Sequence, residues 1–155
     1  APLRGLLGAM RDLCAAYPDL TLVYPVHPNP NVQGPAREIL GDVPNARLLP
    51  PVGYGEFVGL MKRATLMLTD SGGVQEEGPS IGLPILVLRD TTERPEGIDA
   101  GVAKLCGTDP AVVLREARRL LDDPAARAAM QGAENPYGDG RAAARIVEVL
   151  AAAYL

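Results

Sequence analysis

Short apolar runs rich in β-branched residues alternate along the chain with longer stretches whose apolar residues recur at helical spacing. Such runs are typical of buried strands, and the periodic stretches of amphipathic helices. The expected strands are 20–26, 47–49, 66–69, 85–88 and 102–105. The expected helices are 3–16, 54–61, 73–81, 111–121, 124–131 and 139 to about 153. Because strands and helices alternate, the pattern predicts an α/β domain in which helices cover both faces of a parallel sheet.

The first expected element is a helix, with Pro2 where a first-turn proline belongs. A doubly wound α/β domain normally opens on a central strand instead. We therefore expect the chain to begin inside a longer protein. Its 155 residues suit a single domain spanning 1–155.

Charge and composition exclude several classes of function. The chain has 15 basic and 19 acidic residues and no cationic block, which argues against nucleic acid or a membrane surface as a partner. Cys14 and Cys106 form no CxxC pair and there is one histidine, which argues against a zinc site. Both cysteines are interpreted as free core thiols of a reducing compartment. With no visible signal peptide and no apolar run near the ~18 residues of a membrane span, we expect a cytoplasmic location.

The sequence TDSGGVQEE, residues 69–77, places two glycines between an expected strand and the start of a helix. This arrangement gathers backbone N–H groups and the positive end of a helix dipole at one point. Ser71 adds a hydroxyl donor, and Gly72 and Gly73 would let a phosphate approach. The spacing matches neither the P-loop nor GxGxxG, which argues against those two nucleotide-binding motifs. An ordinary Asp/Ser cap with a glycine turn explains the same residues about equally well.

The acidic residues that follow also allow two interpretations. Glu77 lies one helical turn beyond Gly73, where its carboxylate could accept two hydrogen bonds from a ribose diol. Alternatively, Glu76 and Glu77 simply complement the helix dipole. Gln75 and Glu76 are expected to serve packing or the rim of a cleft.

Two further loops carry candidate ligands. His27 in YPVHPNPN directly follows an expected buried strand, where an imidazole can bind a phosphate or move a proton. The alternative is a polar residue in a proline-stiffened loop. Arg94 in RDTTERPE is a candidate anion ligand, because a guanidinium can hold two phosphate oxygens. The alternative is a surface arginine paired with Glu93 or Glu96.

Four stretches together resemble one family. YPVHPNPN, LTDSGGVQEEGPSIGLPILVLRDTTERPEGIDAG, KLCGTD and NPYGDG occur in the order and spacing of the bacterial non-hydrolysing UDP-N-acetylglucosamine 2-epimerases. The resemblance runs from about Leu6 to Leu150. That family has two Rossmann-like domains facing a cleft, the GT-B architecture. This chain resembles only the second, C-terminal domain, without its first strand and the basic HRRE-type loop that should precede Pro2.

The resemblance implies conversion of UDP-N-acetylglucosamine to UDP-N-acetylmannosamine by elimination and re-addition of UDP, without a metal or any other cofactor. The family's proton-transfer acids belong to the N-terminal domain, so this chain alone should be inactive. The implied partners are UDP or UDP-GlcNAc, the N-terminal domain and a second copy in a homodimer. The alternative is a UDP-sugar-binding module, or a GT-B glycosyltransferase-like domain, without epimerase chemistry.

Position by position, the resemblance implies separate roles for the candidate residues. Those expected to bind UDP are Val52 and Phe57 at the uracil, Ser71, Gly72 and Gly73 at the diphosphate, Glu77 at the ribose, and Arg94 at the phosphates or sugar. His27 is expected to be catalytic, contacting the β-phosphate side of the site and assisting departure of UDP.

Overall fold

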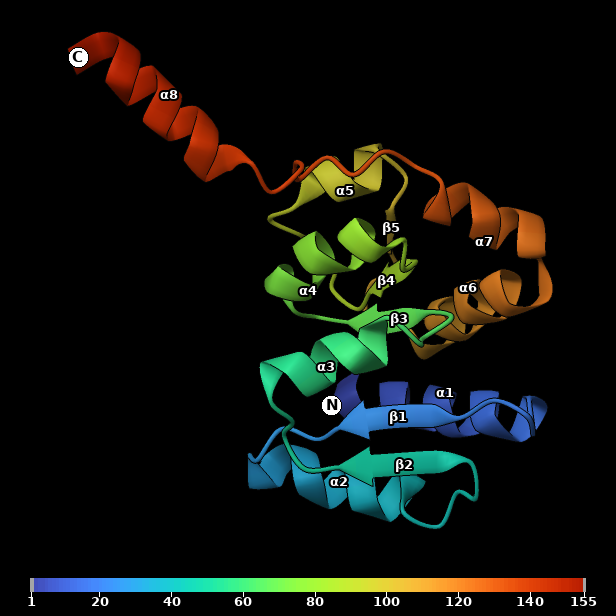
Figure 1. Ribbon diagram of the computed structural model, residues 1–155. Coiled ribbons are helices and arrows are strands. Elements are labelled where there is room, and N and C mark those ends of the chain that lie inside the picture. The colour runs from blue at the N-terminus through green and yellow to red at the C-terminus, as the bar shows by residue number, and fades with distance from the viewer. Residues whose placement is uncertain (1, 155) are drawn as a thin grey trace.

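The computed structural model describes residues 2–154 and contains two parallel sheets (Figure 1). The first sheet pairs β1 (Leu22–Pro25) with β2 (Ala46–Leu49), in a register that sets Leu22 opposite Ala46. The second has the order β3-β4-β5, and its strands are β3 (Met67–Thr69), β4 (Ile85–Val87) and β5 (Ala103–Leu105). Every strand begins and ends within two residues of its predicted bounds.

Helices fill most of the remaining chain. Their bounds are α1 (Pro2–Ala16), α2 (Pro30–Leu40), α3 (Tyr54–Met61), α4 (Gly72–Glu77), α5 (Pro95–Asp99), α6 (Pro110–Asp122), α7 (Pro124–Gln131) and α8 (Ala142–Tyr154). A 3₁₀ turn, η1 (Gly78–Ile81), continues α4 and ends at Gly82, whose φ of 66° is left-handed. Glycine adopts that conformation without the steric penalty of a side chain, so the chain can turn directly into β4.

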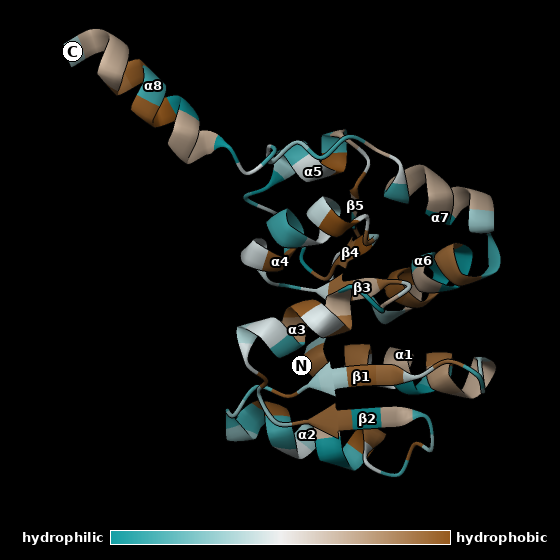
Figure 2. Cartoon of the chain, in the orientation of Figure 1, coloured by the Kyte–Doolittle hydropathy of each residue, from teal (hydrophilic) through white to brown (hydrophobic). Residues whose placement is uncertain are grey.

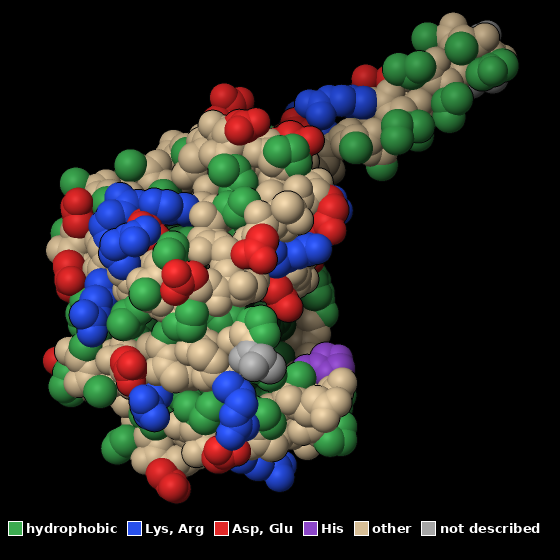
Figure 3. Space-filling view, turned by 180° about the vertical axis from the view of Figure 1, so that it is seen from behind, with side chains coloured by type: hydrophobic (Ala, Val, Ile, Leu, Met, Phe, Trp, Pro, Cys, Tyr) green, Lys and Arg blue, Asp and Glu red, His purple; other side chains and the backbone are tan. Residues whose placement is uncertain are grey.

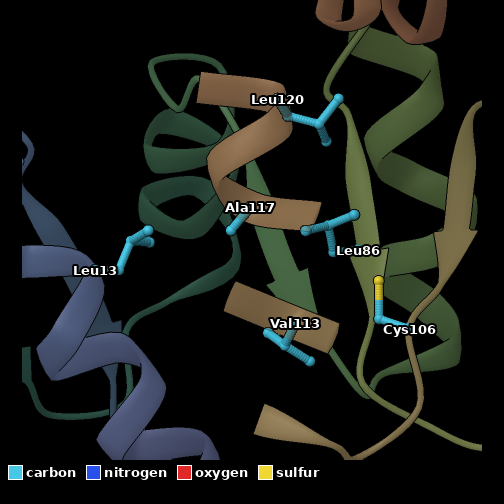
Figure 4. Packing of buried hydrophobic residues seen from close by; sticks show 6 residues of the cluster. All are labelled: Leu13, Leu86, Cys106, Val113, Ala117 and Leu120. Carbon is cyan, nitrogen blue, oxygen red and sulfur yellow. The ribbon is translucent and has the colours of Figure 1, made fainter. Parts of the chain in front are cut away.

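Two hydrophobic clusters pack on opposite faces of β4, whose three residues are buried. On one face, Leu86 contacts a cluster from α1 and α6 that includes Leu13, Val113 and Leu120 (Figure 4). On the other face, the neighbouring residues of β4 lie in a cluster that includes Met61 of α3. Side chains alternate between the faces of a strand, so one short strand anchors both helical layers. The prediction of an α/β domain with helices on both faces of parallel strands is confirmed.

Helix α2 was not predicted. Gly34 and Pro35 interrupt its sequence, and the asparagines and prolines before it are typical of turns. In the structure Asn29 caps the helix by accepting a hydrogen bond from the Asn31 backbone N–H at 2.9 Å, and Pro30 occupies the first turn. The Asn and Pro residues that are typical of turns therefore begin a helix here, because Asn is a favoured N-cap and Pro suits the first helical position.

Helix α8 projects from the rest of the domain (Figure 1). Among its described residues none is buried. Its exposed apolar residues are Ile146, Val147, Val149, Leu150 and Tyr154, with exposed fractions of 51–82 %. Figure 2 shows brown apolar positions on α8, and green apolar side chains cover much of it in Figure 3. Across residues 2–154, no helix combines the length and the apolar character needed to cross a membrane.

Candidate functional site

The predicted site residues all follow strands at one edge of the molecule. His27 follows β1, Val52 follows β2, and Ser71 follows β3, while Arg94 lies in the loop after β4. The carboxyl ends of β1, β2 and β3 point to the same side in Figure 1. Open α/β sheets bind their ligands at this edge. Burial and, to a lesser extent, the Asp70 carboxylate that follows β3 raise the pKa of Tyr24 on β1.

A serine, a glycine and a glutamate form the centre of this edge. A Cβ built on Gly73 would lie 3.9 Å from both the Ser71 hydroxyl oxygen and Oε1 of Glu77. Helical side chains lean toward the N-terminus of their helix, which is why Glu77, at the end of α4, reaches back to Gly73. Within the described chain the Ser71 hydroxyl makes no capping hydrogen bond to α4, contrary to the ordinary-cap interpretation. The bare Gly73 backbone thus lies beside a hydroxyl and a carboxylate.

Gln75 connects the loops that follow β3 and β4. Its side chain is only 1 % exposed, which confirms the expected packing role. The Thr92 hydroxyl donates to Gln75 Oε1 at 2.6 Å, and Gln75 Nε2 donates to the Ser71 carbonyl at 3.3 Å. The backbone N–H of Arg94 in turn donates to the Thr92 hydroxyl at 3.1 Å. One buried amide therefore fixes the position of Ser71 relative to Arg94.

Arg94 forms an ion pair with Glu76. Hydrogen bonding to that carboxylate raises the pKa of Arg94 further. The predicted alternative, pairing with Glu93 or Glu96, is wrong. The Glu93 carboxylate pairs with Arg89 at 2.7 Å, and the Arg94 guanidinium donates to the backbone carbonyl of Glu93, at 3.1 Å, and not to its carboxylate. The reason is geometric, because the Gln75–Thr92 connection brings Arg94 alongside α4. Glu76 is half-exposed.

Val52 and the first half of α3, with Tyr54 and Phe57, lie on the chain directly after β2. Val52 and Phe57 are half-buried, and Phe57 also packs against the cluster around Met61. Tyr54, which sequence reasoning missed, is 69 % exposed. The Glu77 carboxylate raises the pKa of Tyr54. An aromatic residue at the start of a helix was the only sequence signal that could have identified it.

His27 lies on this edge but apart from the Ser71–Glu77 group. Its ring is exposed, and Nδ1 accepts a hydrogen bond from the backbone N–H of Asn29 at 3.2 Å. A neutral ring that accepts at Nδ1 carries its proton on Nε2, so Nε2 can donate to a ligand. Across residues 2–154 no hydrogen bond or ion pair joins His27 to Ser71 or Glu77.

The other buried polar groups are structural. Glu116 on α6 contacts Lys104 at 2.6 Å, Arg115 at 3.1 Å and Arg119 at 3.2 Å. Burial alone would raise the pKa of Glu116, but these cations outweigh it and hold the pKa below its usual value. Cys14 and Cys106 are buried free thiols, as predicted, and burial raises the pKa of Cys106 to about 11. In the described part of the chain, no group of His, Cys, Asp and Glu has the arrangement of a metal site.

Comparison with known proteins gives one consistent family. The family model described as UDP-N-acetylglucosamine 2-epimerase matches residues 1–151. The UDP-N-acetylglucosamine 2-epimerase of Escherichia coli K12 is 53 % identical over 142 residues, which are 92 % of this chain and 38 % of that protein. The chain therefore spans well under half the length of this relative.

Two solved structures show the same fold. A UDP-GlcNAc 2-epimerase from Neisseria meningitidis, bound to UDP-GlcNAc, has a TM-score of 0.92 and 42 % identity, and the match covers 97 % of this chain and 40 % of that one. The S. aureus MnaA–UDP co-structure has a TM-score of 0.93 and 44 % identity, covering 98 % and 42 %.

Proposed function

Because the chain belongs to the UDP-N-acetylglucosamine 2-epimerase family, we propose that it is the C-terminal, UDP-binding half of such an enzyme. The matched relatives are more than twice as long, and two of them are described with UDP or UDP-GlcNAc bound. The proposed partners are the N-terminal domain of the same protein and, as the family resemblance implies, a second copy in a cytoplasmic homodimer.

The division into two sheets supports the proposal that the domain lacks its first strand. A doubly wound domain of six strands has the order 3-2-1-4-5-6. If strand 1 is removed, strands 3-2 separate from strands 4-5-6. Renumbered in chain order, these become 2-1 and 3-4-5, which are the two sheets observed. In the full-length protein, a parallel strand between β1 and β3 would join them into one sheet, as the family resemblance implies.

The observation that carries the functional proposal is the arrangement of Ser71, Gly73 and Glu77. The Ser71 hydroxyl and the N–H groups of Gly72 and Gly73 would donate to the diphosphate of UDP, and Glu77 would accept from the ribose hydroxyls. A ligand that presents phosphate at one end and a diol at the other suits donors and an acceptor that lie this close together.

Four more residues would complete the site. Val52 and Phe57 would line the uracil, because both are half-buried, Val52 just before α3 and Phe57 within it. Arg94 would contact the phosphates or the sugar, and its ion pair with Glu76 would hold the guanidinium in place. His27 would donate from Nε2 toward the β-phosphate as UDP departs.

The proposed reaction proceeds through loss and return of UDP. Removal of the C2 proton and cleavage of the C1–O bond would release UDP and leave 2-acetamidoglucal. Reprotonation of C2 on the opposite face and re-addition of UDP at C1 would then give UDP-N-acetylmannosamine. Donors that hold the diphosphate would keep UDP in place for its return. The acids that move the C2 proton would come from the N-terminal domain.

Deuterium exchange tests the proposal. The full-length protein, incubated with UDP-N-acetylglucosamine in D₂O, should incorporate deuterium at C2 and form UDP-N-acetylmannosamine, as followed by NMR. The 155-residue chain alone should show no exchange. UDP binding by a full-length protein that gives no exchange would instead indicate a UDP-sugar-binding module. Exchange by the isolated chain at the full-length rate would contradict the assignment of proton transfer to the other domain.

A further inference from the structure

Thr92 lies in the loop between β4 and α5, and its hydroxyl makes two hydrogen bonds. It donates to Gln75 Oε1 at 2.6 Å and accepts from the backbone N–H of Arg94 at 3.1 Å. The second bond alone would be an ordinary turn, in which a threonine hydroxyl accepts from the backbone two residues ahead. The first bond is not local, because Gln75 lies on α4, 17 residues earlier in the chain. A role in the turn alone therefore does not account for this side chain.

The direction of each hydrogen bond in this connection is fixed. The Ser71 carbonyl can only accept, so the Gln75 amide directs Nε2 toward it, at 3.3 Å, and Oε1 toward Thr92. The Thr92 hydroxyl has one proton and gives it to Gln75, which leaves its oxygen to accept from Arg94. Because the Gln75 side chain is 1 % exposed, water cannot readily replace these bonds at the amide. A buried group on α4 thus sets the position of the Arg94 backbone.

Helix α4 also holds the side chain of Arg94. Glu76, the residue after the buried amide, pairs with Nε of Arg94, and Nη1 of Arg94 donates to the Glu93 carbonyl at 3.1 Å. Within residues 2–154 no hydrogen bond or ion pair uses Nη2. The guanidinium is therefore held in one orientation, and the N–H donors of Nη2 can bind an anion.

We propose that Thr92 is a positioning residue: its hydroxyl joins the Ser71 loop to Arg94, so that the donors of both act together on the diphosphate of UDP. This inference rests on the proposed function, and it assigns Arg94 to the phosphates rather than to the sugar. Without the hydroxyl, the loop after β4 loses its connection to α4, and the ligand must order Arg94 when it binds. Ordering a long side chain on binding weakens affinity, and a guanidinium that is already in place avoids that cost.

A double-mutant cycle in the full-length protein tests this role. Thr92→Val keeps the shape of the side chain and removes the hydroxyl, and it should weaken UDP binding by about five- to twentyfold, as for the loss of one or two hydrogen bonds. If Thr92 acts through Arg94, the same substitution should change UDP binding by less than about twofold in an Arg94→Ala background. Uridine, which lacks the phosphates, should bind the wild type and Thr92→Val equally within about twofold. Calorimetric titration measures UDP directly and uridine by competition with UDP.

Two conservative variants are the matched controls. Thr92→Ser retains a hydroxyl and should bind UDP within about threefold of the wild type. Thr91→Val makes the same change at the neighbouring residue, which is exposed, and should bind UDP as the wild type does.

Equal weakening of UDP and uridine by Thr92→Val would overturn the proposal, because the substitution would then disturb the whole site. An undiminished loss in the Arg94→Ala background would overturn it as well, since Thr92 would then act by another route. The same conclusion would follow if Thr92→Val left UDP binding unchanged, or if Thr92→Ser bound UDP as weakly as Thr92→Val. Failure of the wild type to bind UDP would instead refute the proposed function.

Discussion

The two sheets of the domain differ in how firmly their ligand-binding edges are held. In the three-stranded sheet β4 is completely buried, and the loops after β3 and β4 are tied together through Gln75 and Thr92. In the two-stranded sheet β1 is half-exposed, with Val23 at 38 %, and the loop after it carries the exposed His27. We infer that the first edge is preorganised to hold UDP, whereas the second presents a single proton donor.

This difference between the two edges leads us to assign substrate binding to one edge and assistance of the chemical step to the other. A group that contacts the substrate equally in the ground state and in the transition state lowers KM without raising kcat. A donor directed at charge that develops only as a bond breaks acts on kcat. The three-stranded edge, with Ser71, Glu77 and Arg94, fits the first role, and His27 fits the second.

The largest expected effect is that of His27→Ala in the full-length enzyme. If Nε2 stabilises departing UDP, kcat should fall by about 10²-fold or more, as for the loss of one general acid or oxyanion donor. UDP affinity should change far less. Steady-state kinetics and calorimetry measure the two effects. A normal kcat with a raised KM would assign His27 to substrate binding and remove the contrast between the two edges. A variant with normal kcat and normal KM would show that His27 is a loop residue without a role in the reaction.

Within the three-stranded edge, Glu77→Ala should weaken UDP binding more than Glu76→Ala. Losing two hydrogen bonds from a carboxylate to a diol should cost on the order of 2–3 kcal/mol, or roughly 30- to 150-fold in Kd. Glu76 is joined to Arg94 by a half-exposed ion pair, whose loss should cost under about 1 kcal/mol. Calorimetric titration with UDP compares the two variants. Equal losses would mean that the ribose acceptor has been wrongly assigned.

The smallest expected effect concerns stability. Gln75→Ala leaves the half-buried Thr92 hydroxyl and the Ser71 carbonyl without their partner, and should lower the free energy of unfolding by about 1–3 kcal/mol. Gln33→Ala, on half-buried α2 beside the other sheet, is the matched control and should change it by less than about 0.5 kcal/mol. Urea unfolding followed by circular dichroism measures both. Similar decreases in the free energy of unfolding for the two variants would show that the two edges are held equally firmly.

Local patterns predicted the elements well where one signal dominated. Helix α7 has its predicted bounds, because Asp123 caps it by accepting from the N–H groups of Ala125 and Ala126 at 2.9 and 3.0 Å. The apolar β-branched runs likewise identified each strand. Helix α2 was missed because Asn29, Gly34 and Pro35 each favour a turn when considered alone, and only the burial of Ala36 and Leu40 decides for a helix.

The candidate site was predictable in position but not in its connections. The strand–glycine–helix pattern identified Ser71 and Glu77, since both lie within one local motif. The contact of Gln75 with Thr92 joins elements that are distant along the chain, and it depends on how α4 lies against the loop after β4. The same holds for the ion pair of Glu116 with Lys104, because Lys104 reaches Glu116 only through the placement of β5 against α6.

The projecting helix α8 has a consequence for the dynamics of the chain. A helix of 13 residues with none buried gains no stability from packing, and isolated helices of that length are marginal in water. Its backbone amides should therefore open by local fraying and exchange with solvent far faster than those of β4, whose opening requires global unfolding. The order of α8 thus depends on whether its apolar face is covered, and its amide exchange rate reports that directly.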